Sequence, residues 1–237
     1  MKLVKFVALL SIITINIAFA NDFGSVKTFN SGEIYYEKAI KEEMVDKLGK
    51  YLIDTYFFDG TPRSVQLRDE GISYTLKFIV SDSLLTDKTY LKQVRYFTYQ
   101  LSDYVFDNTP VDIHLASTYF ITKKVVKFLR LGNKIEVGND DIFYLPEISR
   151  EKADAFINYL KGAGFLTGDG KAILIETVEE IFNFKYPIDA GYENNAEYID
   201  IVKQFADQIS KEFLDNGNIV IYLTDIYFDE LRAISNF

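Results

Sequence analysis

An internal repeat covers almost the whole chain. Shifted by 108 positions, the sequence aligns with itself without a gap, from Gly24 on Gly132 to Val126 on Ile234. Such self-similarity indicates one structural unit used twice. Positions that are alike in both copies therefore report on the fold, and positions that differ are where a function could have been added. Identical pairs include Ile34/Ile142, Tyr36/Tyr144, Asp46/Asp154, Tyr51/Tyr159, Gly60/Gly168, Tyr90/Tyr198, Phe97/Phe205 and Asn108/Asn216.

The N-terminus has the pattern of a secretory signal peptide. Two lysines precede an apolar stretch from Phe6 to Ile17, and Ala18-Phe19-Ala20 has the small residues of a cleavage site. The apolar stretch is too short to span a bilayer as a stable helix. We therefore expect a mature chain that begins at Asn21, is periplasmic or secreted, and has no stable membrane insertion after cleavage.

Composition excludes several kinds of chemistry and partner. The chain has no cysteine, so thiol catalysis and thiolate metal sites are excluded. Residues 24–126 hold 13 Lys/Arg against 14 Asp/Glu, whereas residues 132–234 hold 9 against 20. Because acidic proteins repel phosphate backbones, we expect no nucleic acid partner. The acidic second half either binds a cationic partner or simply keeps an exported protein soluble.

Both copies give the same order of elements: strand, helix, two strands, helix, strand. Residues 45–55 and 90–105 show helical spacing, whereas 72–80 and 111–116 alternate apolar and polar residues as strands do. This order predicts an α+β fold, a tandem duplication of a ferredoxin-like β-α-β-β-α-β module with an antiparallel sheet and its helices on one face. Right-handed crossovers favour the usual strand order of that fold.

The domain boundaries follow from the repeat. We expect a signal peptide at 1–20, a first module at 21–131 and a second module at 132–237. The apolar tail of each repeat, beginning at Thr118 and Ile226, is not explained by four strands. An added short helix or edge strand is expected there.

Two segments carry a resemblance to known proteins. They are Glu33-Ile34-Tyr35-Tyr36 and the run from Tyr56 to Leu67, with weaker counterparts at Asp141-Ile142-Phe143-Tyr144 and from Gly164 to Gly168. The chain resembles uncharacterised exported or envelope-anchored bacterial proteins built from tandem β-α-β-β-α-β modules. The resemblance implies this architecture and no known activity.

Candidate catalytic groups are few. The single histidine, His114, lies two residues from Asp112 on an expected strand, but copy two has Val220 and Tyr222 there. The only duplicated acidic pairs with helical spacing are Glu43/Asp46 and Glu151/Asp154. They suit a hard cation or acid–base chemistry, but acids near a helix start also simply meet the helix dipole. We assign no catalytic residue, no metal ligand and no cofactor.

Three tyrosines need another explanation. Tyr96 and Tyr99 lie opposite the Phe97 side of their helix, where copy two has Gln204 and Asp207. They either pack against the other module or a second protomer, or form a recognition patch for a protein or glycan. Tyr56, opposite Gly164 in copy two, is a weaker case of the same kind.

The leading hypothesis is an exported, non-catalytic binding or structural protein with an unknown protein or glycan partner, and with homo-oligomer formation as an open option. One alternative is an envelope hydrolase that uses carboxylates between the modules. The other is an acidic inhibitor or immunity-type protein whose second module meets a basic partner, with strongly salt-dependent binding.

Overall fold

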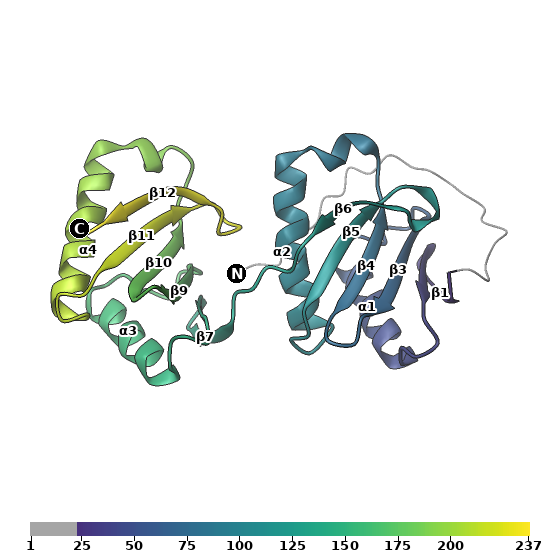
Figure 1. The fold of residues 1–237 in the computed structure, drawn as a ribbon, viewed down its shortest axis with the longest axis horizontal. Helices are drawn as coiled ribbons and strands as arrows, with labels where there is room; N and C mark the ends of the chain where they lie inside the picture. The colour runs from purple at the N-terminus through teal and green to yellow at the C-terminus, as the bar shows by residue number, and fades with distance from the viewer. Residues whose placement is uncertain (1–22) are drawn as a thin grey trace. The chain divides into compact units, whose positions relative to one another are not determined.

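A computed structural model describes residues 23–237. The expected signal peptide lies outside these described residues, so the structure says nothing of it. The contacts divide the chain into two compact units, one ending at Arg130 and the other beginning at Leu131. Figure 1 shows that each unit is a sheet with two helices packed on it.

The first module contains six strands and two helices. Its elements are β1 (Ser25–Phe29), β2 (Gly32–Tyr36), α1 (Glu42–Asp54), β3 (Arg63–Asp69), β4 (Tyr74–Ile79), α2 (Lys88–Tyr104), β5 (Val111–Ala116) and β6 (Thr122–Val126), with 3-10 turns at Asp82–Leu85 and Thr118–Phe120. The tail, where a short helix or an edge strand was expected, contains a 3-10 turn followed by the edge strand β6.

The second module repeats the first. Its elements are β7 (Asn133–Val137), β8 (Asp140–Tyr144), α3 (Arg150–Gly162), β9 (Ala172–Val178), β10 (Ile181–Pro187), a 3-10 turn (Tyr192–Asn194), α4 (Ala196–Glu212), β11 (Ile219–Thr224) and β12 (Glu230–Ser235). Ser149 precedes α3, and its hydroxyl accepts a hydrogen bond from the Lys152 amide at 3.2 Å. Such a cap satisfies an amide that the helix itself leaves unpaired.

The strands of each sheet lie in their order along the chain, β1 to β6 in one sheet and β7 to β12 in the other. The pairs joined by a helix, β2/β3 and β4/β5, are parallel, and the other pairs in the first sheet are antiparallel. The α+β class and the duplication are confirmed, but the ferredoxin-like pairing in an antiparallel sheet is wrong. In that fold the first strand of the β-α-β-β-α-β unit lies between the third and the fourth. Here that first strand is β2, and it lies between β1 and β3.

Both helices of a module pack on the same face of its sheet. In the second module Phe184 of β10 contacts Phe156 of α3 at 5.4 Å and Phe205 of α4 at 6.5 Å, measured between ring centroids. In the first module Tyr51 of α1 stacks on Phe97 of α2 at 5.8 Å. Each module therefore has one core, between its helices and its sheet.

This placement fixes the hand of the two crossovers in a module. The β2–β3 pair runs opposite to the β4–β5 pair, yet both steps move the same way along the sheet. With both helices on one face, the two connections must have opposite hands. One of them is therefore left-handed, which such connections rarely are, and the expectation of right-handed crossovers throughout is wrong.

The duplicated glycine at the start of each module has a clear structural role. Gly24 and Gly132 have φ angles of 96° and 77°, in the left-handed region. A Cβ atom would lie 2.3 Å from the carbonyl oxygen of Tyr36 at Gly24, and 2.2 Å from that of Tyr144 at Gly132. Only glycine allows the chain to pass so close to the neighbouring strand.

Candidate functional site

The sheet surface turned away from the helices, which we call the outer face, carries most of the polar strand residues. In the first module one row crosses it in register: Tyr35 pairs with Gln66, Gln66 with Lys77, Lys77 with His114, and His114 with Val125. Paired residues of neighbouring strands project to the same face. The corresponding row of the second module contains Phe143, Leu174, Lys185, Tyr222 and Ala233.

An aromatic cluster lies at one side of the outer face in the first module. Phe120 follows β5 and packs edge-to-face on Phe23 at 5.4 Å and on Tyr35 at 5.7 Å. Its counterpart Phe228 packs on Phe143 at 6.0 Å. Phe120 and Phe228 both have positive φ angles, 55° and 61°. The shared geometry indicates that this turn is part of the fold.

The lysine at the centre of the second outer face is neutralised within the module. Lys185 Nζ lies 2.9 Å from a carboxylate oxygen of Glu176 and 3.0 Å from one of Glu230. It also lies 5.0 Å from the ring centroid of Tyr222. Burial alone would lower the pKa of Lys185, but the hydrogen bonds to the two carboxylates raise it above its ordinary value.

Lys77 occupies the position of Lys185 in the first module, but the two acidic neighbours are replaced there. The positions of Glu176 and Glu230 are held there by Arg68 and Thr122. Lys77 Nζ donates to the backbone oxygen of Phe120 at 3.4 Å, and no carboxylate of the described residues lies within ion-pair distance of it. Burial and the nearby charge of Arg68 lower the pKa of Lys77, against a smaller opposing effect of Glu70.

His114 is adjacent to Lys77 but is not paired with Asp112. Its Nδ1 atom lies 3.2 Å from the hydroxyl of Thr122. Asp112 instead accepts hydrogen bonds from Lys127 Nζ at 2.7 Å and from the Phe128 amide at 3.0 Å. Burial, followed by the charge of Lys77, lowers the pKa of His114. The structure therefore does not form the acid–base pair considered from the sequence.

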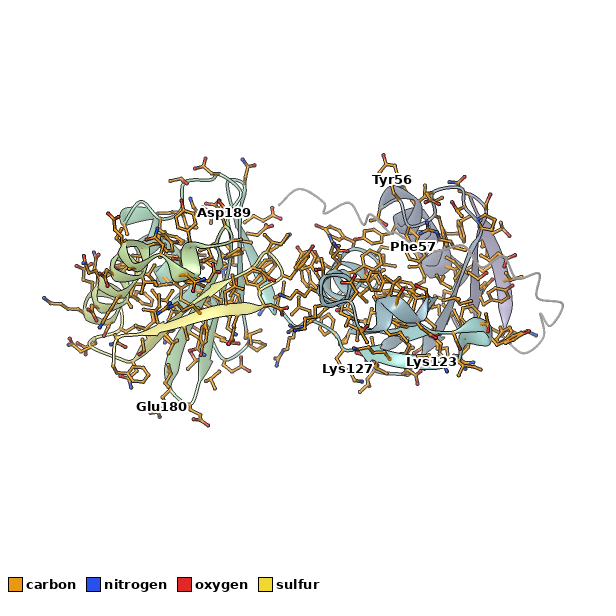
Figure 2. All side chains as sticks on the ribbon, turned by 90° about the horizontal axis from the view of Figure 1, so that it is seen from above. Tyr56, Phe57, Lys123, Lys127, Glu180 and Asp189 are labelled. Carbon is orange, nitrogen blue, oxygen red and sulfur yellow. The ribbon has the colours of Figure 1, made fainter. Side chains whose placement is uncertain are left out.

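The three tyrosines singled out from the sequence lie in different surroundings. Tyr96 and Tyr99 are buried, with 2% and 9% of their surface exposed, and their rings lie 6.0 Å apart. Both side chains are therefore largely removed from solvent. Tyr56 is 57% exposed and projects outward, as Figure 2 shows. Its φ angle is 61°, and Gly164 has a φ of 71° at the same position. A role of the three in binding stays a prediction.

The duplicated carboxylate pairs lie on the solvated sides of α1 and α3. Asp46 forms an ion pair with Lys27 at 2.7 Å, and Asp154 forms one with Arg150 at 2.9 Å. Hydrogen bonds with its own amide and with Ser149 lower the pKa of Glu151, whereas a general acid needs a raised one. In the described part of the chain no group of three or more potential ligands is placed to hold a metal ion.

Comparison with known proteins gives one finding. Residues 26–127, almost the whole first module, match the model of the AF_1994_N family N-terminal domain. No curated protein and no solved structure matches the chain. Among residues 23–237, no helix is long and apolar enough to cross a membrane.

Proposed function

We propose that this chain is an exported, non-catalytic binding protein whose first module carries the binding surface on its outer face. The observation that supports the proposal is the contrast between Lys77 and Lys185. Both are half-buried lysines at the same position of the same fold. Lys185 has two carboxylates within 3.0 Å of its Nζ atom. Lys77 has no carboxylate of a described residue within ion-pair distance.

A half-buried cation without a counter-ion is costly to keep in a folded protein. The second module shows that this fold accommodates the two carboxylates that would remove the cost. Substituting Arg68 and Thr122 for them keeps the charge of Lys77 available. Such an arrangement suits a surface that receives its counter-ion from outside.

The hydrolase alternative has less support. Asp46 and Asp154 are already engaged by cations, and Glu151 has a lowered pKa. The inhibitor or immunity-type alternative draws on the acidic second module. The Glu179–Glu180 turn between β9 and β10 is one exposed part of that acidic surface, and Figure 2 labels Glu180. Binding that weakens steeply with salt would favour this alternative.

Affinity capture tests the proposed function. The mature protein, a Lys77→Gln variant and a Lys185→Gln variant are immobilised in parallel and exposed to extract of the native envelope at low and moderate salt. We expect bound material that is lost with Lys77→Gln and retained with Lys185→Gln. Capture of the same material by all three, or by none, would refute binding through the first outer face.

Export is tested separately. The proposal rests on the pattern of residues 1–20, and it predicts that protein recovered from the native host begins at Asn21. The intact mass of that protein, measured by mass spectrometry, decides between a cleaved and an uncleaved N-terminus.

A further inference from the structure

We propose that Lys77 binds the carboxylate group of a small ligand, which takes the place that Glu176 and Glu230 occupy around Lys185. This inference rests on the proposed function and names the chemistry of the ligand. Its basis is that the second copy of the module has a complementary group beside this lysine, whereas the first copy has none among the described residues. At Lys185 the complementary group is a carboxylate, supplied twice.

The carboxylates near Lys77 have other partners. Glu37 accepts a hydrogen bond from Arg68 at 2.9 Å, and Asp112 accepts one from Lys127 at 2.7 Å. Glu70 attracts Lys77 only from a distance, since no hydrogen bond or ion pair joins them. Lys77 is thus a half-buried cation whose charge is balanced by no carboxylate of the described residues.

The immediate surroundings favour an anion over a cation. Arg68 contributes a second positive charge near Lys77 and is itself held by Glu37 and by the side-chain oxygen of Gln66. The hydroxyl of Thr122 and the ring of His114 add neutral polar groups beside Lys77. Because the site is partly removed from water, attraction between opposite charges is stronger there than in bulk solvent.

The edge of the site is apolar. Val125, paired with His114 on β6, is 41% exposed, and Ile121 in the preceding turn is 57% exposed. A small ligand with a carboxylate at one end and a short hydrocarbon chain matches a lysine beside such an edge. Glutarate, which has a carboxylate at each end of such a chain, serves as the probe, with acetate and inorganic phosphate as comparisons.

His114 provides the measurement. It is the only histidine of the chain, so in tag-free protein its imidazole gives a single set of proton NMR signals. Burial and Lys77 lower its pKa, with Asp112 opposing, Lys127 adding to the decrease and Glu70 opposing weakly. A carboxylate bound to Lys77 offsets the charge of the lysine, so saturating glutarate is expected to raise the pKa of His114.

The decisive variant installs the residues of the second copy, Arg68→Glu with Thr122→Glu. It provides Lys77 with internal carboxylates, and we expect glutarate to bind about tenfold or more weakly than to the wild type. In this variant the pKa of His114 should be raised without any ligand. The matched control is Lys185→Gln, which leaves the first module unchanged and should bind glutarate as the wild type does.

Three results would overturn the inference: no glutarate binding by the wild type, unchanged binding by the double variant, or equal binding of inorganic phosphate, which would indicate an unselective anion site. The first would leave the proposed function standing, because envelope capture does not depend on the ligand being a carboxylate. Far-UV circular dichroism of the double variant checks that it is folded. If it is not folded, Lys77→Gln tests the same contact.

Discussion

Asp140 provides the sharpest test of what holds the second module together. Its side chain is fully buried at the start of β8. One carboxylate oxygen accepts a hydrogen bond from the Gly168 amide at 2.8 Å, and the other accepts from the amides of Gly170 and Lys171 at 2.9 and 2.8 Å. The carboxylate thus fixes the loop between α3 and β9.

The free energy of unfolding that is lost without the Asp140 carboxylate follows from its three hydrogen bonds. An average net hydrogen bond contributes about 1 kcal/mol, so Asp140→Ala should lower the free energy of unfolding by about 3 kcal/mol. Asp140→Asn retains one acceptor oxygen but directs an amide group at a backbone donor, so its loss should be about 2 kcal/mol. The control is Asp169→Ala, since Asp169 is exposed in the same loop and should change stability by less than about 0.5 kcal/mol.

Amide hydrogen exchange is the appropriate assay, because it reads the loop directly even if the two modules unfold separately. We expect the amides of Gly168, Gly170 and Lys171 to lose protection in Asp140→Ala, and to keep it in Asp169→Ala. Equal protection in all three proteins would show that the loop is held by something other than this carboxylate.

The same contact predicts a pH dependence. Burial raises the pKa of Asp140, but hydrogen bonds from the three amides outweigh it and lower the pKa below the ordinary value. Unfolded Asp has a pKa of about 3.9. The advantage of the wild type over Asp140→Asn should therefore be full above that pH, and it should disappear as the pH falls through the lower pKa of the folded state.

Three further predictions concern other parts of the chain. Glu179 and Glu180 have positive φ angles of 50° and 68° in a two-residue turn, so Glu179→Asn with Glu180→Gly should raise the free energy of unfolding, measured by urea denaturation, by about 1 kcal/mol. Gly132→Ala, which brings Cβ to 2.2 Å from a carbonyl oxygen, should lower the melting temperature. Tyr96→Gln with Tyr99→Asp should cost about 3 kcal/mol or more in the same denaturation assay, because both side chains are buried. Unchanged unfolding curves would contradict each estimate.

The repeat made most of the elements predictable, because two sequences agree on each helix and on the inner strands. The strand pairing was not predictable in this way, because a ferredoxin-like module has the same order of elements along the chain. The missing piece was the first hairpin, β1–β2 and β7–β8. Its signal is present as Gly138-Asn139 between short strands, a common two-residue turn. With β1 and β7 already on one side of them, β2 and β8 cannot have the two neighbours that the ferredoxin-like strand order gives to its first strand.

The contrast at the candidate site was visible in the sequence, but it could not be interpreted there. Lys77 and Lys185 are aligned in the repeat, and so are Arg68 with Glu176 and Thr122 with Glu230. Only the pairing of β4 with β3 and β5, together with that of β5 with β6, shows that these positions surround one lysine. Conversely, Tyr96 and Tyr99 looked like surface residues because the helical period shows which side a residue is on, and not what covers it.

The order of the strands also bears on how each module comes to be folded. Within each sheet, every strand after the first lies beside the one that precedes it in the chain, so no strand has to be inserted between two that have already paired. Pairings close in sequence cost little loop-closure entropy and form quickly. A chain that emerges with its N-terminus first thus extends each sheet at one growing edge, and the first module is complete once β6 has joined it, before the second is needed.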